Sequence, residues 1–343
     1  MDLLNNSEIE KIYSLFFDGV PISVQTISTS HGENDFRETV IIENESGEKV
    51  VIKLSDNDFT YPEKIRMWQK TAEEYRLLGY YCPKIYCDKQ GDFPVVAYKG
   101  HNCTVYAEEF AKFSPIEDRA NNEGTNDRTT YKRCKPEIWR MTAKVASKHL
   151  DYTDYPSAYC LFDIFCPSDK TDEVLENALN WKQYAETLDG KFEKQVQRIW
   201  KLWIENRTKL ESVYRDLPTS VFQADLNPTN LLADKDGRFV GVYDFNLCGK
   251  DVFLNYLMRE NVDADFENEI RMICEMLKVS REYYHFTEQE KESALMIYRC
   301  VKPLWYNKIE YLKELGADNE AIQAFLNKTE HYLTKNIDFK KFM

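Results

Sequence analysis

The sequence has no long uncharged apolar run, which argues against a helix that crosses a membrane. No window approaches the roughly 20 apolar residues that a bilayer-spanning helix requires. The N-terminal segment has acidic side chains spread through it and no basic run followed by an apolar one, so it is not typical of a signal peptide. We therefore expect a cytoplasmic protein with no membrane partner.

Several motifs of common site types are also absent. The nine cysteines form no C-x-x-C pair, so neither a zinc site nor a disulfide framework is indicated. The five histidines lie far apart, and neither H-E-x-x-H nor G-x-S-x-G occurs, which leaves metallohydrolases and serine hydrolases without support. The glycine-rich G-x-G-x-x-G of protein kinases is missing as well.

Basic side chains are outnumbered by acidic ones. With 45 Lys and Arg against 58 Asp and Glu, the net charge of -13 disfavours nucleic acid as a partner. An acidic surface would suit a cationic ligand, although a negative balance is also common in cytosolic proteins. The length of 343 residues and a 43% hydrophobic content predict a two-lobed globular protein with a substantial core.

The N-terminal part of the sequence alternates between apolar and polar residues, as β-strands do. The pattern predicts a small antiparallel sheet with one helix, which together form a lobe over residues 1–111. The expected strands cover residues 22–28, 38–43, 49–54, 93–98 and 103–109, with a hairpin turn at 44–47 and a helix over 62–78.

The remaining residues, 112–343, predict a mainly helical lobe with one inserted hairpin. Residues 117–132 are polar and are expected to form an exposed loop. The expected helices cover 136–150, 191–215, 266–277, 288–313 and 319–335, and the hairpin pairs 231–233 with 238–245. The predicted fold class is α+β, and the cleft between the lobes is the expected ligand site.

One segment, 221–244 (VFQADLNPTNLLADKDGRFVGVYD), carries residues suited to phosphoryl transfer. This reaction needs a carboxylate at the attacking hydroxyl and oxygen ligands for magnesium at the phosphates. Asp225 and Asn230 lie five residues apart, and the return strand of the hairpin ends near Asp244. The hairpin therefore presents three such side chains at one edge.

The segment resembles the H-G-D-x-x-x-x-N … D-F signature of aminoglycoside phosphotransferases, choline kinases and related small-molecule kinases, which have a two-lobed protein-kinase-like fold. The resemblance implies that Asp225 is the catalytic base and that Asn230 and Asp244 bind Mg²⁺. It also implies transfer of the γ-phosphoryl group of ATP or GTP to a hydroxyl of a small acceptor, such as an aminoglycoside, an amino alcohol or a sugar.

Two departures from this signature leave alternatives open. Gln223 and Ala224 replace its His and Gly, and Asn246 follows the Asp-Phe pair. The replacements suggest a pseudokinase or a nucleotide-binding scaffold without turnover as one alternative. A protein kinase is a second, which the missing glycine-rich loop disfavours. Asp251 and Asn255 are expected to stabilise the loop. The sequence leaves the oligomeric state, the acceptor and its binding residues undecided.

Lys53 lies in an apolar strand, VVIKL, where a buried ammonium requires an anion. In kinase-like folds this anion is the α- and β-phosphates of the nucleotide, and a glutamate of the next helix holds the lysine. Periodicity places Glu74 beside the inward stripe of the 62–78 helix and Glu73 nearly opposite it. We therefore expect Glu74 to pair with Lys53.

Further nucleotide contacts are expected from two loops. The loop over 28–36 is expected to cover the phosphates, which the hydroxyls of Ser28, Thr29 and Ser30 could contact. By analogy with kinase-like folds, adenine is expected to bond to the backbone near Glu109 and Ala111.

Overall fold

The computed structural model describes residues 3–30, 35–118, 129–260 and 265–343, and these form two compact units. The first unit comprises Met1–Lys135, Cys166–Ser168 and Asp225–Gly249, and the second comprises Pro136–Phe165, Asp169–Ala224 and Lys250–Met343. The expected division into 1–111 and 112–343 differs from this one, because the hairpin that carries the candidate site residues belongs to the N-terminal unit.

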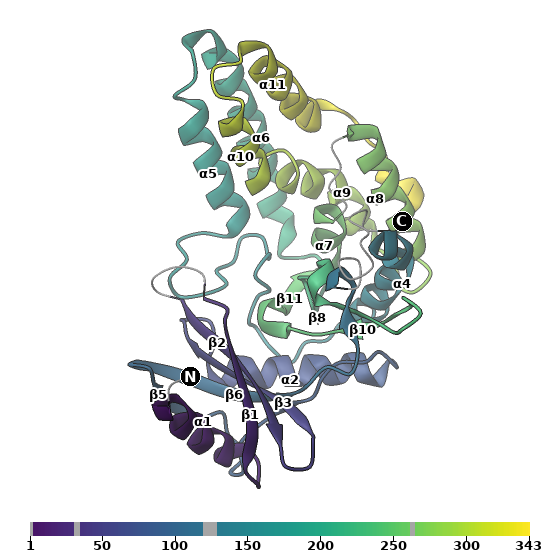
Figure 1. Ribbon diagram of the computed structural model, residues 1–343. Helices are drawn as coiled ribbons and strands as arrows, with labels where there is room; N and C mark the ends of the chain where they lie inside the picture. Colours follow the sequence, from purple (N-terminus) through teal and green to yellow (C-terminus); the bar gives the residue numbers. More distant parts are fainter. Residues whose placement is uncertain (1–2, 31–34, 119–128, 261–264) are drawn as a thin grey trace. The chain divides into compact units, whose positions relative to one another are not determined.

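An antiparallel sheet forms the centre of the first unit (Figure 1). Its strand order is β1-β2-β3-β6-β4, and β5 pairs with β6. The strands are β1 (Pro21–Ser28), β2 (Phe36–Asn44), β3 (Lys49–Asp56), β4 (Ile85–Tyr86), β5 (Val95–Tyr98) and β6 (His101–Glu109). This confirms the predicted sheet, to which the structure adds the short β4.

Strand alternation gives this sheet two different faces. One face packs against helix α1 (Leu3–Phe16), where Ile9 and Phe16 meet Val40 and Ile52 in the buried core. The opposite face carries the side chains that alternate with this core, Lys53 among them. The sequence analysis missed α1, although its buried residues follow the helical i, i+3, i+4, i+7 spacing from Ile9.

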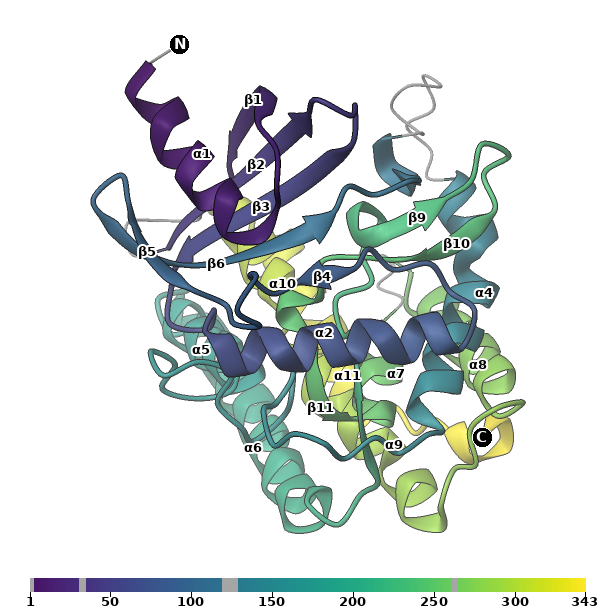
Figure 2. The same ribbon diagram turned by 90° about the horizontal axis from the view of Figure 1, so that it is seen from below.

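Helix α2 (Pro62–Leu77) begins at the predicted proline. It runs beside β4 in the first unit (Figure 2). Its Trp68 ring meets Tyr106 edge-on at a centroid distance of 5.8 Å. Two turns further along, Tyr75 meets Phe245 at 5.5 Å. The buried residues of α2 are mainly apolar, with Lys64 and Thr71 as the polar exceptions, and they fill space between the sheet and the segment that follows the hairpin.

The predicted hairpin is present as β9 (Leu231–Ala233) and β10 (Phe239–Val242), and β7 (Ser114–Pro115) pairs with β9. The backbone of Tyr81 bonds to both sides of Gly241, donating to the Val240 carbonyl at 2.9 Å and accepting from the Val242 N–H at 3.0 Å. This close approach leaves no room for a side chain at Gly241. It ties the hairpin to the chain that leaves α2.

Helices make up most of the second unit. The elements are α4 (Thr129–Ala146), which begins in the first unit, α5 (Glu173–Ala185), α6 (Glu193–Tyr214), α7 (Phe253–Arg259), α8 (Phe266–Ser280), α9 (Glu288–Val301), α10 (Tyr306–Glu314) and α11 (Asn319–Thr334), with the paired strands β8 (Thr219–Phe222) and β11 (Gly249–Val252). Of the helices within the described ranges, none has the length and apolar character needed to cross a membrane.

Three sequence expectations about the helices were wrong. The helix expected over 288–313 is two helices, because Pro303 lies between α9 and α10 and a proline lacks the N–H that would continue the ladder. Helix α4 starts before Pro136 and contains it. Of the loop expected over 117–132, residues 119–128 lie outside the described ranges and 129–132 are helical. Helices α5 and α7 were not predicted.

The fit between Gly241 and Tyr81 can be tested by substitution. A Cβ at Gly241 would lie 1.7 Å from the Tyr81 carbonyl oxygen, so Gly241→Ala must displace backbone. We expect it to lower the free energy of unfolding by about 2–4 kcal/mol in urea denaturation. Gly190→Ala is the control, because a Cβ at Gly190 meets nothing within 4 Å and its φ is not positive. Equal stability of the two variants would contradict the fit.

Candidate active site

Two carboxylates hold the ammonium of Lys53, on the sheet face opposite α1. Its Nζ lies 2.9 Å from Asp244 Oδ1 and 3.3 Å from Glu108 Oε2. The Lys53 side chain is 18% exposed and that of Glu108 is 8% exposed, whereas Asp244 is 32% exposed. The cluster is thus buried on the Glu108 side and opens at Asp244.

Burial and charge act in opposite directions on this cluster. Burial alone would lower the pKa of the Lys53 ammonium, but the charges of Asp244 and Glu108 outweigh it and hold the pKa well above its usual value. Burial raises the pKa of Glu108, and Lys53 opposes this rise. Lys53 therefore stays charged, and its charge offsets the cost of burying the Glu108 carboxylate.

The position of Glu108 follows from strand register. Lys53 lies opposite Tyr106 in the β3–β6 pair, and Glu108 is two residues further along β6 on the same face. A long side chain reaches such a diagonal neighbour. The sequence analysis missed Glu108, although its alternation with Tyr106 on a strand next to Lys53 could have indicated it.

The expected pairing of Lys53 with Glu74 is wrong. Among the described residues, the carboxylates within ion-pair distance of Lys53 are Glu108 and Asp244. The physical reason is that the inner face of α2 is filled by apolar packing, including Tyr75 on Phe245, while the sheet itself offers a carboxylate. A contact of Glu74 with nucleotide stays a prediction.

Asp244 and Asn230 are brought together by the hairpin. The Tyr243 N–H donates to the Asn230 carbonyl at 3.1 Å, one step beyond the Leu231–Val242 pair. Asp244 has a left-handed backbone, with φ 59° and ψ 68°. Non-glycine residues seldom adopt this conformation, and Asp does so more readily than most. Asp244 lies two residues after the end of β10 and directs the chain into the 3-10 turn Phe245–Leu247.

Side-chain amides hold the carboxylate of Asp225. Asn227 Nδ2 donates to its two oxygens at 3.0 and 3.1 Å, and Asn230 Nδ2 donates to Oδ2 at 2.9 Å and to the Asp225 carbonyl at 3.1 Å. Asn227 also accepts from the Thr229 N–H at 3.0 Å and so caps the turn Pro228–Asn230. The structure thus brings Asp225 and Asn230 into contact and adds Asn227, which the sequence analysis missed.

The side-chain oxygens of Asn230 and Asp244 suit a hard cation whose remaining coordination positions are filled by a bound ligand and water. Asn230 uses its amide nitrogen on Asp225, which leaves Oδ1 as its metal-binding atom, and the partly exposed Asp244 supplies carboxylate oxygen. Within the described ranges, no group of three or more His, Cys, Asp or Glu has metal-binding geometry. Magnesium commonly takes one or two carboxylates and completes its shell with phosphate and water.

A cavity of about 80 Å³ adjoins the lysine cluster. Lys53, Tyr106 and Asp244 line it, together with Arg37 and Thr29. Arg37 supplies a second positive charge beside Lys53 and pairs with Asp35 at 2.8 Å. The sequence analysis did not single out Arg37.

Of the three hydroxyl residues expected at the phosphates, the one that lines this cavity is Thr29. Ser30 Oγ bonds the backbone of Arg37, accepting at 2.9 Å and donating at 3.1 Å, and Ser28 is exposed. Residues 31–34 of the expected phosphate loop lie outside the described ranges. Phosphate contacts of Ser28 and Ser30 remain predictions.

The expected adenine contacts lie at the end of β6. The Glu109 N–H donates to the Lys84 carbonyl at 2.8 Å, so it is already engaged. For the N–H of Ala111, the described residues offer no hydrogen-bond partner, which keeps this group available to a ligand.

In the second unit, Asp251 anchors a buried hydrogen-bond network, as expected of a loop-stabilising residue. Asp251 is 2% exposed, and its carboxylate accepts from Ser157 Oγ at 2.8 Å, Tyr214 OH at 3.2 Å and the Val252 N–H at 2.7 Å. Asn255 Nδ2 donates to both carboxylate oxygens at 3.3 and 3.2 Å. Gln223, two residues before Asp225, is fully buried.

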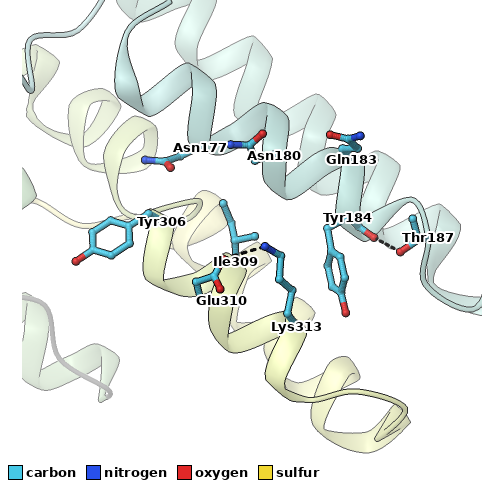
Figure 3. Close-up of a pocket in the computed structure, with 9 residues that line it drawn as sticks. All are labelled: Asn177, Asn180, Gln183, Tyr184, Thr187, Tyr306, Ile309, Glu310 and Lys313. Carbon is cyan, nitrogen blue, oxygen red and sulfur yellow. Dashed lines mark hydrogen bonds and ion pairs between the residues drawn. The ribbon is translucent and has the colours of Figure 1, made fainter. Parts of the chain in front are cut away.

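A larger cavity, of about 570 Å³, lies between α5 and α10 (Figure 3). Its α5 wall is uncharged and rich in amides, whereas its α10 wall holds an ion pair between Lys313 and Glu310 at 2.9 Å. The lining residues are Asn177, Asn180, Gln183, Tyr184, Thr187, Tyr306, Ile309, Glu310 and Lys313. We call this cavity the α5–α10 groove. The sequence analysis named no residue of it.

Comparison with known proteins shows which family the segment around Asp225 resembles. Residues 164–254 match the model of the phosphotransferase enzyme family (APH), a range that contains Asp225, Asn230 and Asp244. This confirms the resemblance over that part of the chain. A search of curated protein sequences finds no significant match.

Solved structures with a similar fold cover nearly the whole chain. A microcompartment-associated aminopropanol kinase aligns with a TM-score of 0.57 and 13% identity over 95% of each chain. An amicoumacin kinase, in complex with AMP-PNP, Ca²⁺ and Ami, aligns at 0.55 and 14% over 98% of this chain and 97% of that one. A spectinomycin phosphotransferase, in complex with ADP and spectinomycin, aligns at 0.50 and 12% over 98% and 96%. The expected kinase-like α+β fold is thus confirmed.

The lysine cluster predicts a pH-dependent loss of stability on Lys53→Met. The substitution leaves Glu108 and Asp244 close together without their cation, which we expect to cost about 2–4 kcal/mol at pH 8 in urea denaturation. The pKa of Glu108 is already raised in the folded protein and rises further without Lys53, so folding favours its proton. The variant should therefore recover stability as the pH falls from 8 to 5.

Lys49→Met is the matched control. Lys49 lies on the same strand and pairs with Glu43 at 3.6 Å, but its side chain is 48% exposed and that of Glu43 is 34% exposed. Its loss should change the free energy of unfolding by less than about 1 kcal/mol. An equally small, pH-independent effect of Lys53→Met would show that the cluster does not stabilise the fold.

Proposed function

We propose that this protein is a small-molecule kinase that transfers the γ-phosphoryl group of ATP or GTP to a hydroxyl of a small acceptor. The observation that carries the proposal is the set of side chains that the first unit brings together. A lysine with two carboxylates, an Asp–Asn pair and a second Asp on one hairpin come together from separate stretches of the chain. Phosphoryl transfer requires little beyond such positioning and charge.

Each group has a role in this proposal. Lys53 binds the α- and β-phosphates of the nucleotide, with Glu108 holding its ammonium in place. Asn230 and Asp244 hold Mg²⁺, which neutralises charge on the phosphates when it is bound. Asp225 accepts or orients the proton of the attacking hydroxyl. The amides on Asp225 support this role, since they fix the orientation of its carboxylate.

Two of the similar structures also support a nucleotide donor. The amicoumacin kinase was solved with AMP-PNP and Ca²⁺, and the spectinomycin phosphotransferase with ADP. Carried over to this chain, they favour a nucleotide donor with a divalent cation. Ala111, at the end of β6, is the proposed backbone donor to the base.

For the acceptor we propose a small hydroxyl-rich molecule that is bound in part by the α5–α10 groove. The groove offers amides that donate and accept hydrogen bonds, and the Tyr184 and Tyr306 rings against which a sugar-like ring can pack. Glu310 already has a lysine partner, so the groove gives no strong preference for a cation. An aminoglycoside, an amino alcohol or a sugar would each meet this description.

The proposal is tested by Asp225→Asn, which keeps volume and removes charge. We expect turnover to fall about 10²–10⁴-fold, as general-base loss does, with nucleotide affinity almost unchanged because Lys53 and the metal ligands are intact. The measurements are nucleotide consumption with a panel of aminoglycosides, amino alcohols and sugars, and nucleotide titration. Asp236→Asn, in the exposed turn of the same hairpin, should behave as the wild type.

Gln223→His separates this proposal from a scaffold without turnover. If the wild-type protein binds nucleotide, transfers phosphate to no acceptor and gains activity only through Gln223→His, the scaffold replaces the kinase. Wild-type turnover in Asp225→Asn with an identified acceptor would instead refute the role of Asp225.

The groove makes a separate prediction for the acceptor found in that panel. Asn180→Leu and Tyr306→Ala should each raise the KM for the acceptor about tenfold, with kcat and the KM for nucleotide little changed, because they remove uniform binding. Leu179→Ala is the control on α5, since Leu179 is 45% exposed and does not line the groove. Unchanged acceptor KM values in both groove variants would place the acceptor elsewhere.

A further inference from the structure

A buried arginine at the end of α7 has no role in the chemistry described so far. Arg259 is 8% exposed, and its guanidinium lies over the Tyr159 ring at 3.6 Å from the centroid. It forms a loose ion pair with Glu260 at 3.8 Å. Burying a guanidinium costs free energy unless its N–H groups form hydrogen bonds, so the hydrogen bonds of Arg259 indicate its role.

Arg259 Nη2 donates to the carbonyl oxygen of Ala224. That carbonyl belongs to the peptide bond whose nitrogen is that of Asp225. Because a peptide unit is planar, a bond that fixes the carbonyl also fixes the direction in which the chain enters Asp225. Residues 223–227 are in neither helix nor strand, so no ladder of a sheet or helix does this instead.

The arginine itself is held from behind. Lys302 Nζ donates to the Arg259 carbonyl at 2.8 Å and to the Glu260 carbonyl at 2.7 Å. A lysine on the last carbonyls of a helix is a stabilising C-terminal contact. Lys302 is 2% exposed, so this contact is shielded from water. The end of α7 is therefore a firm support for the Arg259 side chain.

We infer that Arg259 is a positioning residue for Asp225, acting through the Ala224 carbonyl and touching neither nucleotide nor acceptor. The inference rests on the proposed function for its catalytic part, because a positioned Asp225 matters only if Asp225 is a base. Its structural part, the anchoring of residues 222–226, stands independently of any activity.

The anchoring is tested by amide hydrogen exchange in Arg259→Lys and Arg259→Gln. A hydrogen bond from a charged donor holds a buried carbonyl, and its loss should speed exchange of the peptide over 222–226 by at least about tenfold. Arg207→Lys is the matched control. Arg207 is also a buried arginine of the second unit and lies over an aromatic ring, Phe162 at 4.2 Å, but it bonds Asp172. It should leave exchange over 222–226 unchanged.

The catalytic part is tested by kinetics in the same variants. We expect kcat for phosphoryl transfer to fall about 10–100-fold in Arg259→Lys, with the KM for nucleotide unchanged, because a misplaced base slows chemistry and does not weaken phosphate binding. A general loss of stability would instead lower the fraction of active protein, and with it the apparent kcat. Arg207→Lys measures the size of that effect.

The outcomes separate the two proposals. Faster exchange over 222–226 with a lower kcat supports both. If the wild-type protein turns over no acceptor, the proposed function fails, and exchange still decides the anchoring. Exchange equal to that of the wild type refutes the positioning role, as does faster exchange with full turnover. Exchange that rises equally throughout the second unit, α9 included, would make Arg259 a packing residue and also refute it.

Discussion

A lysine ammonium that is largely withdrawn from water must have negative charge beside it, and this requirement unites distant parts of the first unit. Lys53 comes from β3, Glu108 from β6 and Asp244 from the chain after β10. One cation faces two carboxylates, so the cluster has an excess negative charge before any ligand binds. We expect such a cluster to receive a phosphate readily only together with a further cation, in agreement with the proposed metal–nucleotide donor.

Backbone contacts, more than side chains, determine where the hairpin residues of the site lie. The Tyr81 backbone bonds on both sides of Gly241, and the Tyr243 N–H bonds to Asn230. These bonds leave little freedom at the edge from which Asn230 and Asp244 project. Asp225 differs, because side-chain amides and the peptide bond before it hold it in place. The site thus combines a rigid hairpin with a loop that depends on individual polar contacts.

Local patterns in the sequence predicted a large part of this arrangement. Strand alternation gave β1, β2, β3 and β6, and the short spacing between Asp225 and Asn230 placed them in one loop, where they are in contact. What failed depends on tertiary packing. The choice between Glu74 and Glu108 is decided by what fills the inner face of α2, and a helical wheel does not contain that information. The contact of Arg259 with Ala224 joins residues that no periodicity relates.

The discontinuous make-up of the first unit affects the order in which the chain can fold during synthesis. The sheet leaves the ribosome early, whereas Asp225–Gly249, which belongs to the same unit, follows only after much of the second unit has been made. Until then Lys53 has one carboxylate partner and the backbone of Tyr81 has no strand to bond. Closing so long a loop is slow, and until it closes the incomplete sheet exposes surface that chaperones bind. A fragment that ends at Lys135 would be incomplete in the same way and would need the hairpin supplied in trans.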